Sequence, residues 1–209
     1  MPLLGRKLRL KMANLFFNQH SEDFWVWVNP DNWLVKHQIT VTGGFTSGGL
    51  IKEKKSNLMF IPNQEFEGDI SAFHHGITRD YLAEYNLEQG RERYFTQYPS
   101  RLNAIYLFKS EEEAYKYSDR HKWHVGDRKL KKCYSKVSLG YSIHDLSWVD
   151  FLRLLHSVDA ESLDYISRAY WSGQKVEDFQ LESMGKPWIQ KPIFEVLFLG
   201  RVEFYDRNI

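Results

Sequence analysis

One stretch near the end of the chain, residues 192–204, constrains the fold more than any other. From Ile193 to Leu199 every residue is apolar except Glu195. A run this apolar is typical of a strand whose two faces are both covered. Burying a lone carboxylate costs several kcal/mol, about what burying two large apolar side chains contributes. Glu195 therefore either has a Lys or Arg partner on the next strand or a wet edge position, or it does chemistry at the end of a buried strand.

The size and charge of the chain limit its organisation. Its 209 residues are 43% apolar and 16% aromatic, which is enough for one sizeable core. The 28 basic and 27 acidic residues nearly cancel, so no global electric field recruits a nucleic acid or an anionic membrane. We expect a basic, disordered N-terminal arm over residues 1–20 and a single domain over residues 21–209.

Cysteine content and the start of the chain bear on location. A single cysteine, Cys133, excludes an internal disulfide framework and fits a reducing compartment. The apolar residues at the start are broken by charge too often for a secretory core or a membrane span. We expect a cytoplasmic protein with no membrane partner.

Hydrophobic patterns and capping signals predict a mixture of strands and helices. Because strands and helices do not alternate regularly, the pattern favours an α+β fold. The two glycine pairs in residues 40–49 are more typical of a flexible loop than of a phosphate-binding loop. Ser110 and Glu113 have the spacing of a reciprocal capping box. Strands are expected at 24–28, 57–61, 102–108, 130–139 and 192–204, and helices at 33–37, 79–95, 111–120, 145–155 and 159–172.

Two kinds of ligand site can be weighed from the residues alone. The histidine pairs 74–75 and 121–124 lack a third ligand fixed by spacing, so the sequence predicts no metal site. Arg101 lies between a proline turn and a predicted strand. Its planar guanidinium could clamp a phosphate or carboxylate, or could tie the turn to backbone carbonyls.

Five short motifs follow one another along the chain, at residues 88–95, 98–108, 111–114, 170–173 and 194–197. Together they resemble a bacterial family of uncharacterised proteins that is similar to ADP-ribosyltransferases. The resemblance covers the chain from about Phe24 to its end and implies a split, twisted β core with flanking helices that holds NAD+ in a cleft.

The resemblance implies roles for three residues. Glu195 corresponds to the glutamate that stabilises the oxocarbenium ion, and Tyr106 to a residue that packs near the nicotinamide. Arg101 would lie at the cleft edge near the pyrophosphate.

The residue that positions the ribose on the first core strand has two alternatives. If that strand is residues 24–28, the expected polar residue is replaced by Trp27 or displaced to Asn29. If it is residues 73–78, His75 takes the position, as in a His-Gly-Thr type of motif.

The implied chemistry gives a reason for a buried carboxylate. Breaking the bond between ribose and nicotinamide develops positive charge on the ribose, which a preorganised anion stabilises. The resemblance thus implies an NAD+-dependent ADP-ribosyltransferase that uses NAD+ as substrate, needs no metal and modifies a macromolecule. Ile193 stands where arginine-modifying relatives carry a second acid, which slightly favours RNA or DNA over protein as acceptor.

The biological role follows by analogy alone. Small members of the superfamily serve as toxins or phage-defence effectors, which would imply an inhibitory antitoxin partner. Two alternatives to a transferase stay open. One is a catalytically inactive nucleotide- or nucleic-acid-binding domain, and the other is an NAD+ glycohydrolase.

Overall fold

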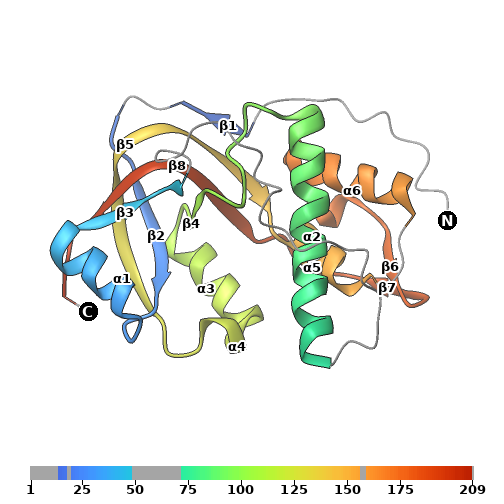
Figure 1. Ribbon diagram of the computed structural model, residues 1–209. Helices are drawn as coiled ribbons and strands as arrows, with labels where there is room; N and C mark the ends of the chain where they lie inside the picture. Colours follow the sequence, from blue (N-terminus) through green and yellow to red (C-terminus); the bar gives the residue numbers. More distant parts are fainter. Residues whose placement is uncertain (1–13, 18–19, 49–71, 156–158, 209) are drawn as a thin grey trace.

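The fold of the chain is α+β, as the sequence predicts, with helices packed against an antiparallel sheet (Figure 1). The computed structural model describes residues 14–17, 20–48, 72–155 and 159–208, with residues 72–80 described by their backbone alone.

Two long strands form the centre of the sheet. They are β5 (Lys129–Asp145) and β8 (Phe194–Phe204), which pair antiparallel over the whole length of β8. Four shorter strands pair antiparallel with these two. On β5 lie β1 (Leu15–Phe16) and β2 (Asp23–Val28), and on β8 lie β3 (Gly44–Thr46) and β4 (Ile105–Leu107).

The longer helices gather beside the sheet. In Figure 1, α2 (Ala72–Tyr94) stands with α5 (Ser147–Leu154) and α6 (Ala160–Trp171), and it packs against both. Between this group and the sheet lie α3 (Glu111–Arg120) and α4 (Lys122–Val125).

Shorter elements complete the described chain. A small antiparallel hairpin, β6 (Leu181–Ser183) with β7 (Lys186–Trp188), is separate from the main sheet. The remaining elements are α1 (Trp33–His37), the π-helical turn η1 (Gln38–Thr42) and the 3-10 turn η4 (Val176–Asp178).

Both faces of β8 are covered, which confirms the prediction for the last strand. Val196 and Phe198 belong to a core that includes β2 side chains such as Phe24. Leu197 belongs to a second core, formed largely by α2, α5 and α6. Because side chains alternate along a strand, Glu195 points to the same face as Leu197, toward the helices.

Part of the predicted N-terminal arm is ordered in the sheet. Leu15 and Phe16 pair with Ser142 and Tyr141 of β5. The predicted arm is therefore wrong for these residues, because a two-residue strand is too short to show a period in the sequence.

The predicted flexible loop at residues 40–49 is also wrong over its centre. Residues 44–46 form β3, and Gly44 approaches β8 so closely that a Cβ there would lie 1.9 Å from the carbonyl oxygen of Val202. Gly44 therefore allows β3 to approach β8 closely and does not indicate a flexible loop. The strand expected at residues 57–61 lies outside the described residues.

Two predicted strands differ from the structure for local reasons. The strand considered at residues 73–78 is wrong, because these residues form the first turns of α2, which begins at Ala72. Adding residues to the helix predicted at 79–95 costs less free energy than nucleating a separate element. The strand expected at 102–108 shortens to β4, because the amides of Asn103 and Ala104 both donate to the carbonyl of Ser100 and turn the chain.

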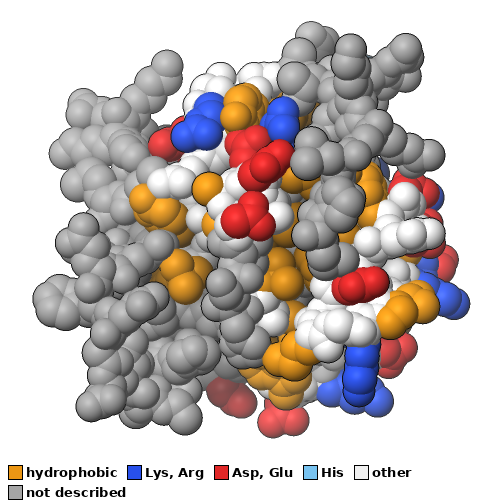
Figure 2. All heavy atoms as spheres, turned by 90° about the vertical axis from the view of Figure 1, so that its right-hand side faces the viewer, with side chains coloured by type: hydrophobic (Ala, Val, Ile, Leu, Met, Phe, Trp, Pro, Cys, Tyr) orange, Lys and Arg blue, Asp and Glu red, His pale blue; other side chains and the backbone are white. Residues whose placement is uncertain are grey.

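The right-hand side of Figure 1 is shown in Figure 2. On this face acidic side chains lie next to basic ones, with hydrophobic side chains between them. Its described residues thus form no large area of a single charge, in keeping with the near-zero net charge of the chain.

Candidate functional site

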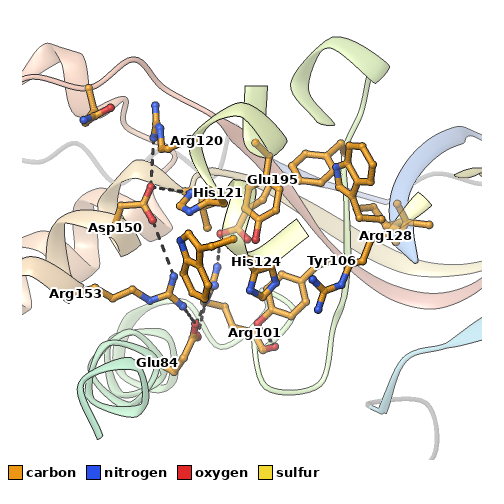
Figure 3. A pocket seen from close by; sticks show the side chains of 18 of the residues that line it. Glu84, Arg101, Tyr106, Arg120, His121, His124, Arg128, Asp150, Arg153 and Glu195 are labelled. Atoms are coloured by element: carbon orange, nitrogen blue, oxygen red, sulfur yellow. Dashed lines mark hydrogen bonds and ion pairs between the residues drawn. The ribbon is translucent and has the colours of Figure 1, made fainter. Parts of the chain in front are cut away.

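A cavity of about 590 Å³ lies between the sheet and helices α2 to α5 (Figure 3). Its lining includes four arginines, three carboxylates, two histidines and six aromatic rings. This volume falls within the roughly 300–1,000 Å³ typical of small-molecule sites. A concave lining that combines aromatic rings with charged groups suits an aromatic, charged ligand.

Four of the six residues predicted for the site line this cavity. They are Trp27, Arg101, Tyr106 and Glu195, which come from β2, the turn before β4, β4 itself and β8. The structure therefore brings together side chains that are up to 168 residues apart in sequence, counting from position 27 to 195.

The other two predicted residues are Asn29 and His75. Asn29 follows β2, where its Oδ1 accepts a hydrogen bond from the amide of Asp31 at 2.9 Å, so it serves the turn. Asn29 does not line the cavity. His75 lies in the first turns of α2 and not on a strand, and its side chain lies outside the described part of the structure.

Glu195 has two side-chain partners. Its Oε1 accepts a hydrogen bond from the hydroxyl of Tyr170 at 2.8 Å and another from Nη1 of Arg101. The residue is only 3% exposed. Burial raises the pKa of Glu195, and the nearby charge of Glu84 adds to this, although Arg101 and Tyr170 act in the opposite direction.

Arg101 binds carboxylates of its own chain. Its Nε donates to Glu84 at 2.7 Å and its Nη2 donates to the other oxygen of Glu84 at 3.0 Å, which is a bidentate pair. Burial alone would raise the pKa of Glu84, but the charge of Arg101, its hydrogen bonds and then Arg153 lower it. Arg101 lies on the cavity wall, but its guanidinium is occupied by Glu84 and Glu195, and the phosphate clamp is not supported.

A buried ion pair shapes the turn that presents Arg101. The carboxylate of Glu88 accepts from Arg91 at 2.8 and 3.0 Å and from the hydroxyl of Ser100 at 2.9 Å. Arg91 also donates to the carbonyls of Thr96 and Tyr98, both at 3.3 Å. These bonds satisfy backbone carbonyls in the turn that follows α2. Glu88, Arg91 and Ser100, which belong to the motifs at residues 88–95 and 98–108, therefore have a structural role.

Polar groups also lie behind Glu195. The ring of Tyr170 stacks on His144 with centroids 4.5 Å apart, and Nε2 of His144 lies 2.7 Å from the hydroxyl of Ser142. Burial lowers the pKa of His144 to about 3, so its imidazole is neutral at physiological pH. A neutral ring beside Tyr170 leaves Arg101 as the positive partner of Glu195.

A second charged group lies around Asp150. Its carboxylate is 3.3 Å from Nη1 of Arg120 and 3.2 Å from Nε2 of His121, with Arg153 at 4.0 Å (Figure 3). This group was not predicted, because Asp150 and Arg153 lie between the apolar positions of an amphipathic helix, where charged residues are ordinarily solvated.

The aromatic residues predicted for the site are held at their polar ends. The hydroxyl of Tyr106 donates to the carbonyl of Arg101 at 2.6 Å, while the residue remains 41% exposed. The indole nitrogen of Trp27 donates to the carbonyl of Ala114 at 3.1 Å. Each ring can therefore present its apolar surface without leaving a polar atom unsatisfied.

Two further features, a metal-binding cluster and a membrane-spanning helix, are absent from the described residues. No three His, Cys, Asp or Glu side chains there are grouped as a metal site would require. Among the described helices, none combines the length and apolar character needed to cross a membrane.

Comparison with known proteins identified a family but no curated relative. No curated protein matched the chain. A family model described as "Protein of unknown function (DUF2441)" matches residues 13–205, which is most of the chain, and the chain therefore belongs to that family.

Proposed function

We propose that the chain is an NAD+-dependent ADP-ribosyltransferase in which Glu195 stabilises the transition state. The observation that carries this proposal is the place of Glu195, a buried carboxylate with a raised pKa on the wall of an aromatic, arginine-rich cavity. Buried carboxylates with perturbed pKa values are concentrated at functional sites. The antiparallel core with flanking helices supports an ADP-ribosyltransferase-like fold as part of the same proposal.

The proposed chemistry cleaves the bond between the ribose and the nicotinamide nitrogen. The electron pair of that bond leaves with nicotinamide, and positive charge develops on the ribose carbon and ring oxygen. The carboxylate of Glu195 stabilises this charge. An acceptor oxygen or nitrogen then forms a bond to the ribose carbon and loses its proton.

Arg101 and Tyr170 would act as positioning residues. Both hold Oε1 of Glu195, which fixes the carboxylate in one orientation. The bound nicotinamide carries a positive charge, which would favour the ionised form of Glu195 against the effect of burial.

The rest of the proposal concerns partners and setting. RNA or DNA is favoured over protein as the acceptor, because Ile193 stands where arginine-modifying members of the superfamily carry a second acid. A cytoplasmic role as a toxin or phage-defence effector, with an inhibitory antitoxin, is proposed by analogy to the superfamily alone.

The test is nicotinamide release from NAD+, followed by mass spectrometry with RNA, DNA or protein in separate tubes. Glu195→Gln should lower release about 10²- to 10³-fold, the loss expected when a transition-state-stabilising group is removed. Glu182→Gln, a change at an exposed site, is the matched control. Absence of release in every tube from folded wild-type protein would overturn the proposal.

One observation favours the alternative of a catalytically inactive binding domain. The carboxylate of Glu195 is already paired with Arg101, as a purely structural ion pair would be. In that case Glu195→Gln should change stability and leave the binding of a nucleotide intact. Release of nicotinamide that no polymer accelerates would instead indicate an NAD+ glycohydrolase.

A further inference from the structure

The charges that line the cavity do not cancel. Three of its four arginines are paired with its three carboxylates, within 4.0 Å. The pairs are Arg101 with Glu84 and Glu195, Arg120 with Asp150, and Arg153 with Glu84 and Asp150.

The fourth arginine, Arg128, differs from the others. Its Nη1 donates to the carbonyl of Val125 at 3.3 Å, and it pairs with no carboxylate among the described residues. Figure 3 shows Arg128 on the side of the cavity away from Asp150 and Arg153. The uncompensated positive charge of the cavity therefore lies at Arg128.

An exposed aromatic ring lines the same cavity. Trp123 of α4 is 80% exposed, although a tryptophan is usually at least partly buried. Its ring meets that of His124 edge-on, with centroids 5.6 Å apart. A flat, solvent-exposed indole that lines the same cavity as a guanidinium with no carboxylate partner offers a base-stacking surface, and the guanidinium offers a phosphate ligand.

We infer that Arg128 and Trp123 form a nucleotide subsite, in which Arg128 binds the phosphates and Trp123 stacks on the base. This deepens the proposed function and rests on it for the identity of the nucleotide. The phosphate role expected of Arg101 passes to Arg128, because the guanidinium of Arg101 is occupied by Glu84 and Glu195. A planar guanidinium can bind two phosphate oxygens at once.

The test is equilibrium binding of ADP-ribose, ADP and adenosine, measured by calorimetry, which does not depend on turnover. Arg128→Gln should weaken ADP and ADP-ribose at least about tenfold, the equivalent of about 1.4 kcal/mol, and leave adenosine within about twofold. Trp123→Ala should weaken all three ligands, and Trp123→Phe should restore them. Lys129→Gln, the neighbouring exposed cation, is the control and should change none of them.

Salt dependence gives a second measurement. Loss of a phosphate contact should make the dependence of ADP affinity on salt concentration shallower in Arg128→Gln than in the wild type. Equal affinities of the wild type and Arg128→Gln for ADP would overturn the inference. So would an equal loss for adenosine, or absence of ADP-ribose binding to the wild type.

The same experiments separate this inference from the proposed function. If no nicotinamide is released but ADP binding depends on Arg128, the transferase proposal fails and the subsite stands. If nicotinamide is released and Arg128→Gln leaves the KM for NAD+ unchanged, the subsite fails and the transferase proposal stands.

Discussion

Arg101 donates a hydrogen bond to the carboxylate of Glu195, although 94 residues separate them in the chain. The same guanidinium binds the half-buried Glu84, so two carboxylates share one positive charge. They are not equivalent, because Arg153 lies near Glu84 at 3.8 Å. Its charge helps to lower the pKa of Glu84, whereas burial and the charge of Glu84 raise the pKa of Glu195.

The two carboxylates should therefore respond differently to neutralisation. Glu84→Gln removes an ionised bidentate partner of the buried Arg101 and should destabilise the fold by about 1–3 kcal/mol, the cost of losing hydrogen bonds between charged groups. Glu195→Gln should cost less, because an amide oxygen can still accept from Tyr170 and the charged form of Glu195 is already disfavoured. Urea unfolding of both variants measures the two free energies. A larger loss of unfolding free energy in Glu195→Gln than in Glu84→Gln would contradict this expectation.

Tyr170→Phe tests the orientation of Glu195. The change removes the hydroxyl that donates to Glu195 at 2.8 Å and accepts from Arg101 at 2.6 Å, and keeps the ring on His144. Stability should fall by about 1–3 kcal/mol and nicotinamide release by about tenfold or more. The control is Tyr134→Phe, whose hydroxyl donates at the same distance to Glu203, and neither of these two residues lines the cavity. Equal effects of the two changes on release would contradict the positioning role.

Features encoded by adjacent residues could be predicted from the sequence. Asp159 caps α6 by accepting from the amide of Ser162 at 2.8 Å, and Gly173 follows that helix with a φ of +72°. The helix at 33–37 and the strand at 24–28 were confirmed almost to the residue. In each case the signal and the structure lie within a few positions of each other.

Hydrogen bonds between residues that are distant in sequence could not be predicted. Ser110 caps α3 through the amide of Glu113, as expected, but the carboxylate of Glu113 does not return to Ser110. It accepts from the amide of Phe194 at 2.8 Å instead. Likewise, sequence could indicate that Glu195 needs an explanation, but only the packed structure selects Arg101 from a turn, rather than a residue of the next strand, as its partner.

Gly90→Ala tests the close contact between α2 and α6. A Cβ at Gly90 would lie 1.9 Å from Oγ of Ser167 and 2.8 Å from its Cβ. Overpacking of this kind should destabilise the fold by about 1–3 kcal/mol, even though alanine favours a helix more than glycine does. Ser167→Gly should recover much of that loss when combined with Gly90→Ala, giving a favourable coupling in a double-mutant cycle. Strict additivity in thermal unfolding would show that the two helices do not meet there.

The pH dependence of the free energy of unfolding should reflect the lowered pKa of His144. Burial lowers its pKa from the ordinary 6.5 to about 3, with the charge of Arg101 adding to the effect. In the window between these values the unfolded chain binds a proton that the folded chain does not. The stability contributed by neutral His144 is therefore fully present above pH 6.5 and is lost as the pH falls toward 3.

Unfolding of the wild type and His144→Asn by urea, at several pH values in that window, isolates this contribution. The free energy of unfolding of the wild type should rise with pH more steeply than that of the variant, by at most about 1.4 kcal/mol per pH unit. Glu195, whose pKa is raised, acts with the opposite sign above its unfolded value, but it is present in both proteins and largely cancels in the difference. Parallel profiles would mean that His144 is protonated in the folded state, which its burial against Tyr170 argues against.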